Sequence, residues 1–286
     1  MKSLEDIFNY SRFMMYARLK WAELRKPTIL WGVVLFVLIS ILFSWHSVYI
    51  LSHYYSRHTE NLPYFVQVGR DPTHSFVHLG AVFISWLLST IIGNITFREL
   101  GVRSKRISFF CLPVSTFEKT VFVLLGSFLA CVAYAILVIC ADWVRVVVAE
   151  LVFPMYAECI KPFFSNGEIF TYMDSDYTLA DFVLLYASVP LLLHSFFMLG
   201  SVVWKKLSFL KTAIVLSVSF IAGFFLLFHW IEHLNHDING YVYMDEWGKD
   251  LNPYCLFSSI MLLVTVFNWV MTYYRLKETE VIHRLY

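Results

Sequence analysis

Long apolar runs separated by short polar segments set the pattern of this chain. Each run stays apolar over about 20 residues, the length that a helix needs to cross the hydrocarbon core of a bilayer. Barrel strands would instead alternate apolar and polar positions in segments of about ten residues. The pattern therefore predicts six transmembrane helices, near residues 28–50, 76–97, 119–141, 181–204, 211–233 and 254–274. The third run can continue through Trp143 to Val148.

The opening 27 residues follow a different pattern. A helical projection at about 100° per residue gathers their apolar residues on one face and most of their charges opposite. That apolar face consists of Leu4, Ile7, Phe8, Met14, Met15, Leu19, Trp21 and Ala22. A helix of this kind lies in the membrane interface, and Pro27 is expected to break it before the first span. The sequence leaves open whether it is a simple anchor or a mechanical elbow.

The predicted fold is therefore an all-α integral membrane protein with three parts. These are an amphipathic interfacial helix over residues 1–27, a six-helix transmembrane domain over 28–275 and a cytoplasmic tail over 276–286. Composition agrees, because 59% hydrophobic and only 15% charged residues exceed what a soluble domain can bury. The first apolar run begins near residue 28 without a small-residue cleavage site behind it, so we expect no cleaved signal peptide.

The basic residues predict the orientation of the spans. With the amino terminus inside, 17 of the 22 Lys and Arg residues fall in inner segments, and 14 of the 21 acidic residues fall in outer ones. The positive-inside rule then places both termini of a multi-pass protein in the cytoplasm. The inner basic residues are Lys2, Arg12, Arg18, Lys20, Arg25, Lys26, Arg98, Arg103, Lys105, Arg106, Lys119, Lys205, Lys206, Lys211, Arg275, Lys277 and Arg284. Nothing in this distribution indicates nucleic-acid binding.

The inner segment between the second and third spans, residues 97–119, carries the strongest signal. It combines five basic residues with an apolar core. Ser115 and Glu118 have the spacing of a capping box, which starts a helix, and Leu112-Pro113 supplies a turn before it. The segment is therefore expected to form a short cytoplasmic helix, a turn and a new span.

This segment resembles the permease subunits of ABC-2 type exporters, whose inner loop reads roughly F-x-E-L, a basic stretch, then L-P-x-S-x-x-E-K. The matching residues are Phe97, Glu99, Leu100, Arg106, Leu112, Pro113, Ser115, Glu118 and Lys119. The layout is similar over nearly the whole chain, including the amphipathic start and the basic carboxyl end at Tyr273–Glu278. It departs in its long outer loop between the third and fourth spans, since many such permeases place re-entrant outer helices between the last two spans.

The resemblance implies a transport subunit of the inner (cytoplasmic) membrane. It would work as a homodimer or heterodimer with separate cytoplasmic ABC ATPase subunits. The chain has no GxxxxGK[ST] motif, so it is not expected to hydrolyse ATP itself. In such permeases the inner loop passes ATPase closure to the membrane helices. The residues expected to couple the two are Glu99, Arg103, Arg106, Pro113, Glu118 and Lys119, with the charged side chains contacting the ATPase and Pro113 fixing the turn. The alternative is a membrane scaffold or accessory subunit that transports nothing, and the sequence does not indicate a substrate.

Histidines suggest two remote alternatives. His229, Glu232 and His233 have the H-x-x-E-H order of inverted zinc proteases, although His, Trp and Glu are also usual at the end of a span. Haem ligation would need paired histidines from His46, His78, His194 and His229, whose predicted depths disagree. We therefore expect no catalytic residue, cofactor or metal site. Besides the ATPase and a second permease, the expected partner is membrane lipid.

Other residues predict contacts within the bundle. Asp142 and Arg145 are spaced to pair on one helical face, either as a polar gate or partner contact or on a helix that continues above the bilayer. Asn268 is a candidate for an interhelical hydrogen bond, and three glycines could permit close helix approach. These are Gly93, Gly126 and Gly200. Cys159 and Cys255 are the cysteines placed toward the outer side, where a disulfide is possible and the sequence does not decide it.

Overall fold

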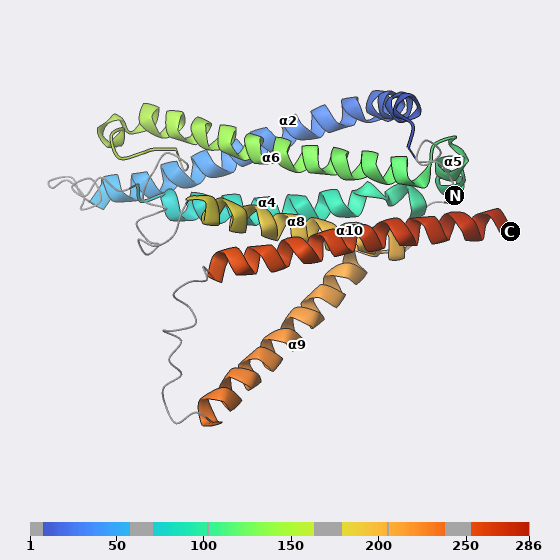
Figure 1. Cartoon of the computed structure of the whole chain (residues 1–286). Coiled ribbons are helices and arrows are strands. Elements are labelled where there is room, and N and C mark those ends of the chain that lie inside the picture. Colours follow the sequence, from blue (N-terminus) through green and yellow to red (C-terminus); the bar gives the residue numbers. More distant parts are fainter. Residues whose placement is uncertain are drawn as a thin grey trace. The chain divides into compact units, whose positions relative to one another are not determined.

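The computed structural model describes residues 8–57, 71–101, 103–162, 179–204, 206–237 and 253–285. Within these residues the chain forms helices joined by turns (Figure 1). The α-helices are α2 (Tyr10–Arg57), α4 (His74–Thr96), α5 (Arg103–Cys111), α6 (Thr116–Val152), α8 (Leu179–Val203), α9 (Ser208–Asp237) and α10 (Pro253–Leu285). Two 3-10 helices, η1 (Arg98–Gly101) and η2 (Pro154–Tyr156), lie in the connections. "Inner" and "outer" below denote the predicted cytoplasmic side and the opposite side.

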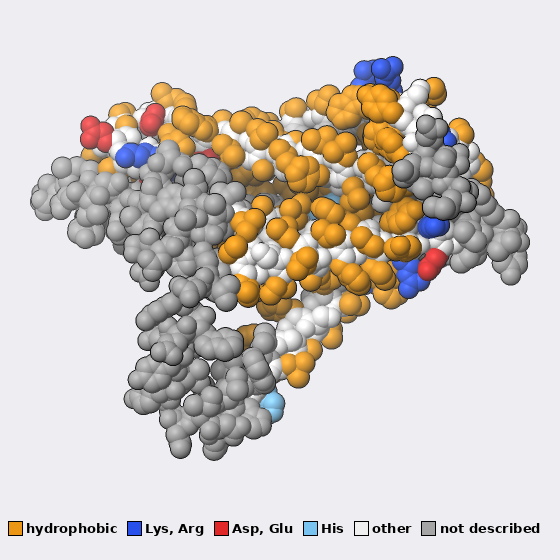
Figure 2. All heavy atoms as spheres, in the orientation of Figure 1, with side chains coloured by type: hydrophobic (Ala, Val, Ile, Leu, Met, Phe, Trp, Pro, Cys, Tyr) orange, Lys and Arg blue, Asp and Glu red, His pale blue; other side chains and the backbone are white. Residues whose placement is uncertain are grey.

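The six predicted spans are confirmed as helices long and apolar enough to cross a membrane. The corresponding stretches among the described residues are Tyr10–Ser56, Phe76–Ile95, Thr116–Val152, Leu184–Val203, Ser208–Leu226 and Cys255–Thr279. Large apolar side chains remain exposed along them, and Figure 2 shows hydrophobic side chains over most of the described surface in view. Such a surface suits a lipid environment, in which only structures that satisfy their own backbone hydrogen bonds can cross.

The first helix corrects one expectation. Pro27 was predicted to break the chain into an interfacial helix and a span, but α2 is continuous and contains Pro27. A proline inside a helix removes one backbone hydrogen bond and kinks the helix without necessarily ending it. Figure 1 shows the first, dark-blue part of α2 nearly end-on and the remainder along the page, so the helix changes direction. From Tyr10 onward the two predicted parts are therefore one bent helix, while residues 1–7 of the predicted interfacial helix lie outside the described residues.

The third span continues beyond the bilayer, as the sequence allowed. Helix α6 has 37 residues, which at 1.5 Å per residue is about 55 Å, well above the roughly 30 Å of the hydrocarbon core. Asp142 and Arg145 lie in its last part. The prediction that both residues belong to a continued third helix is therefore confirmed.

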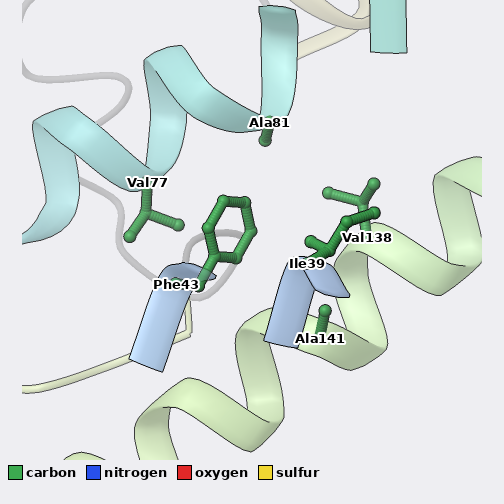
Figure 3. Packing of buried hydrophobic residues seen from close by; sticks show 6 residues of the cluster. All are labelled: Ile39, Phe43, Val77, Ala81, Val138 and Ala141. Atoms are coloured by element: carbon green, nitrogen blue, oxygen red, sulfur yellow. The ribbon is translucent and has the colours of Figure 1, made fainter. Parts of the chain in front are cut away.

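The chain divides into two compact units, Met1–Leu88 with Leu124–Asp176, and Ser89–Val123 with Tyr177–Tyr286. In the first unit an apolar cluster joins α2, α4 and α6 (Figure 3). The Phe43 ring of α2 lies near Val77 and Ala81 of α4, and Ile39 of α2 lies near Val138 and Ala141 of α6. Because lipid is as apolar as these side chains, close packing rather than water exclusion stabilises such a cluster.

In the second unit a hydrogen bond and a close backbone contact join the helices. The Asn268 side-chain amide of α10 donates to Ser195 Oγ of α8 at 3.0 Å, which confirms the predicted interhelical bond. Gly93 of α4 lies against the backbone of α8, where an added Cβ would meet the His194 carbonyl oxygen. Gly200 of α8 lies against the Thr212 side chain of α9. Close approach is thus confirmed for these two glycines.

The inner connection between α8 and α9 is a tight turn. Leu207 adopts a left-handed conformation with φ of 52°, immediately before α9 begins at Ser208. Ser208 Oγ donates to Asn94 Oδ1 at 2.7 Å, so the Asn94 side chain ties the inner end of α4 to the start of α9. Helix α9 then returns toward the outer side and diverges from α10 (Figure 1). The chain therefore reverses direction between α8 and α9, and α9 is splayed away from α10.

Gly93→Ala is expected to destabilise the protein, because the new methyl group collides with backbone that cannot rotate away. A cost of about 1–3 kcal/mol is typical of such overpacking. Gly126→Ala is the matched control, since a Cβ at Gly126 meets nothing within 4 Å among the described residues. Thermal unfolding in detergent should show a clear drop for Gly93→Ala and none for Gly126→Ala. Equal behaviour of the two variants would contradict the close approach of α4 and α8.

Candidate functional site

The segment between α4 and α6 folds as predicted, into a short helix, a turn and the next span. Helix α4 ends at Thr96 and passes into η1, and α5 follows. Phe97 and Leu100 are buried and anchor the 3-10 turn. The nine-residue α5 ends at Cys111, and residues 112–115 lead into α6. All of this segment belongs to the second unit.

The start of α6 is the predicted capping box. The Ser115 hydroxyl accepts from the backbone N–H of Glu118 at 3.1 Å, and the Glu118 carboxylate accepts from the N–H of Ser115 at 2.9 Å. Two N–H groups that a helix start leaves without partners are thereby satisfied. Glu118 is fully buried. Because it lies in the first turn of α6, its charge is also near the positive end of the helix dipole.

Lys119 fastens α5 to α6. Its side chain is buried, and its ammonium nitrogen lies 5.2 Å from the centre of the Phe109 ring and 5.8 Å from that of Phe110. A cation over aromatic faces contributes about 0.5–2 kcal/mol, with the larger values where water is excluded. Since both rings belong to α5, this contact fixes the orientation of the short helix on the first turn of α6.

A small cavity lies where this segment meets the inner ends of other helices of the same unit. Its lining includes Leu100 and Arg106, Ser201 and Val202 of α8, and Thr279 of α10. The volume is about 10 Å³, room for a single water at most. Such a gap marks close packing with little slack, and it shows that η1 and α5 lie against the ends of α8 and α10.

One side of α5 remains exposed. Ser104, Lys105, Ile107, Ser108 and Cys111 are exposed, whereas Phe109 is buried and Phe110 and Arg106 are half-buried. Ser104, Ser108 and Cys111 follow the four- and three-residue spacing of a single helical face. Helix α5 is therefore attached through one face and free to contact another molecule through the other.

The predicted coupling residues divide into groups. Glu118 and Lys119 are buried and support the segment from within. The resemblance implies that these charged side chains contact the ATPase, for which they would have to be exposed. Arg106 and Glu99 are half-buried, and Pro113 is exposed in the turn. The side chain of Arg103 lies outside the described residues. Sequence reasoning did not single out Lys105 and Ile107 as contact residues, although both side chains are exposed.

A second polar site, in the first unit, is centred on Arg145. Its Nε donates to Asp142 at 2.7 Å, which confirms the predicted pair. One Nη donates to Asp71 at 3.1 Å and to the Thr73 hydroxyl at 2.7 Å, and the other donates to the Lys161 carbonyl at 2.9 Å. Arg145 is fully buried. These bonds tie α6 to the residues that precede α4 and to the segment that follows η2.

Asp71 and Thr73 were not found by sequence reasoning. Asp71 Oδ1 accepts from the Thr73 backbone N–H at 2.8 Å and from its hydroxyl at 2.6 Å, a local turn just before α4. The available signal was Asp71-Pro72-Thr73, a typical helix-start sequence. Nothing in that signal indicates a partner 74 residues away. An isolated Arg145 would extend its charge toward water, whereas here two carboxylates hold it inside.

The histidine motifs do not form a site in the part of the chain that the structure describes. No group of three His, Cys, Asp or Glu side chains among the described residues could hold a metal ion. His229 is exposed, and the side chains of Glu232 and His233 lie outside the described residues. His46 stacks on Phe76 with ring centres 3.4 Å apart, and His194 is buried against neighbouring helices.

No protein-family model, curated protein or solved structure matches the chain. Its class therefore follows from its own architecture, with six apolar helices of membrane-spanning length and helical structure throughout the described ranges. The chain is an α-helical multi-pass membrane protein. Within it, polar and cationic contacts add to apolar packing at two places, the α5 segment and the buried Arg145 network.

Arg145→Met is expected to lower the free energy of unfolding by about 3–5 kcal/mol, because it leaves two buried carboxylates without their cation. Arg275→Met is a matched control. Arg275 also lies 3.1 Å from a carboxylate, that of Glu278, but these side chains are 56% and 60% exposed. An exposed pair contributes about 0–1 kcal/mol. Chemical denaturation in mixed micelles should separate the two variants, and a similar small loss for both would exclude a structural role of the network.

Cys159 is expected to react slowly with maleimide at neutral pH. Burial, followed by the nearby charges of Glu158 and Asp71, raises the pKa of its thiol above the ordinary 9.0, partly offset by Lys161. The reactive thiolate is therefore scarce until the pH rises well above neutral. Cys111, an exposed free thiol, is the control.

Both Cys159 and Cys255 are free thiols in the structure, so alkylation of denatured protein should detect each. A bridge between them, resistant to alkylation until reduced, would contradict this assignment.

Proposed function

We propose that the chain is the permease subunit of an ATP-driven exporter and that α5 receives the movement of a separate cytoplasmic ATPase. The observation that carries the proposal is the two-sided character of α5. Phe109 is buried and the Lys119 contact holds the helix on α6, while the side chains of Lys105, Ile107 and Ser108 remain exposed. A short helix attached in this way suits the transmission of force from a partner.

The packing of the second unit supplies a route for that force. Displacement of α5 acts on α6 through Lys119 and the Ser115–Glu118 cap. It also acts on the inner ends of α8 and α10, whose residues line the small cavity beside Arg106. Helices transmit such movement because packed interfaces are close to incompressible. In this proposal Glu118, Lys119 and Pro113 position α5, while Lys105, together with Arg103 and Glu99, contacts the ATPase.

The remaining parts of the proposal come from the resemblance of the inner segment. They are a second permease copy or related chain, a location in the cytoplasmic membrane, and outward movement of substrate at the interface between the two permeases. The six spans and the exposed apolar side chains along them support a location in a membrane. The zinc hydrolase alternative requires stoichiometric zinc that is lost on His229→Ala, and the accessory-subunit alternative is separated from transport below.

Lys105→Glu is expected to weaken ATPase association without unfolding the chain, because the Lys105 side chain is exposed. The protein would be purified in detergent from its native membranes, and co-purifying ATPase and its ATP turnover would be measured. Reversal of one interfacial charge should lower association about tenfold or more. Lys161→Glu makes the same charge change at an exposed side chain in the other unit and should leave association intact.

Three outcomes distinguish the candidate functions. An ATPase that co-purifies, loses association in Lys105→Glu and drives substrate efflux supports the permease. An ATPase that binds but whose efflux activity persists when this chain is deleted supports an accessory subunit. Absence of any ATPase from preparations of the unmodified chain contradicts the proposal.

A further inference from the structure

The first part of α2 carries apolar and cationic side chains on the same exposed face. Met15, Leu19 and Trp21 are 71%, 57% and 60% exposed. Arg18, Arg25 and Lys26 are exposed as well. Figure 2 shows blue and orange side chains next to each other over this part of the helix. An exposed surface of this kind needs an environment that accepts apolar groups and cations together.

Helical spacing makes these residues a continuous stripe. Counting from Met15, Arg18, Leu19, Ala22, Arg25 and Lys26 lie three, four, seven, ten and eleven positions on, which is one face of an α-helix. The opposite face is different. Tyr16 is buried, and Lys20 is 12% exposed and paired with Glu23 at 3.1 Å. Near Tyr16 and Lys20 this side of the helix is therefore covered, whereas the stripe with its three cations is exposed.

The length of α2 places this stripe outside the hydrocarbon core. The helix has 48 residues, about 70 Å, and only about 20 residues are needed to cross. The continuously apolar run begins near residue 28. The preceding turns therefore lie beyond one face of the bilayer, and the change of direction along α2 allows them to follow that face (Figure 1).

We propose that the stripe from Met15 to Lys26 binds the headgroups of anionic phospholipids, with Met15 and Leu19 inserted at the acyl boundary. Charge complementarity favours this occupant, because three cations attract anionic headgroups and the interleaved apolar residues gain a matching surface at the same depth. Continuity with the first span holds the stripe at the interface. This inference does not depend on whether the chain transports a substrate.

The test uses the full chain in nanodiscs, with a bimane fluorophore on Leu19→Cys in a background without other cysteines. Quenching is compared between brominated phosphatidylglycerol mixed with plain phosphatidylcholine and brominated phosphatidylcholine mixed with plain phosphatidylglycerol, in equal proportions. Enrichment of the anionic lipid should make the first mixture quench more strongly, by about twofold or more.

Variants then assign the effect to the stripe. Replacing Arg18, Arg25 and Lys26 with Gln should bring the two mixtures to equal quenching, while Arg18→Lys with Arg25→Lys should keep the difference. The control replaces Lys206, Arg275 and Lys277, three exposed cations elsewhere on the chain, with Gln. It removes the same charge and should leave the preference unchanged.

Each other outcome overturns the proposal in a defined way. Strong but equal quenching by both lipids in the unmodified chain would show a surface that inserts without recognising anionic headgroups. Quenching by neither lipid would show that the stripe faces water or another protein. Loss of the preference in the control variant would show general charge attraction rather than binding at this helix.

Discussion

Hydrocarbon solvates neither backbone polar groups nor charges, and this constraint governs the whole chain. Because every peptide group must find its partner within its own segment, the spans are helices, and their apolar surfaces stay exposed to the surrounding lipid. Helix contacts then depend on shape and on a small number of polar bonds. Gly93 lets α4 approach the backbone of α8, and Asn268 bonds α10 to α8. Close approach and scarce polar contacts are the usual basis of helix association in membranes.

The same constraint explains why buried charges among the described residues have fixed surroundings. Arg145 is held by two carboxylates, a hydroxyl and a backbone carbonyl. The bonds to Asp71, Thr73 and Lys161 connect α6 to the turn before α4 and to the segment after η2. Lys119 lies over two aromatic rings, and Glu118 caps the helix in which it lies. Removing an ion from water costs several kcal/mol. These contacts must offset a free energy of that order. Charges are therefore placed where they join chain segments, at the ends of the apolar runs.

Local patterns made part of this predictable. The spans follow from runs of about 20 apolar residues, and the Ser115–Glu118 cap and the Asp142–Arg145 pair follow from a spacing of three residues. Contacts between distant segments could not be predicted in this way. Asp71 joins Arg145 across 74 positions, and Lys119 meets its rings only because α5 folds back on α6. Pro27 misled for a related reason, since the surrounding structure decides whether a proline ends a helix or bends it. Within the proposed coupling site, burial separates positioning residues from contact residues, and burial depends on tertiary structure.

Sidedness is the central claim, because both the proposed ATPase contact at α5 and the lipid contact at α2 require the basic segments to face the cytoplasm. The most direct measurement labels single cysteines in intact cells with a membrane-impermeant maleimide, at Lys105→Cys in α5 and at Lys161→Cys after η2. Both side chains are exposed, so access depends on the side of the membrane. The account predicts labelling at position 161 in intact cells and labelling at position 105 only after permeabilisation. Ready labelling at position 105 in intact cells, with none at position 161, would contradict it.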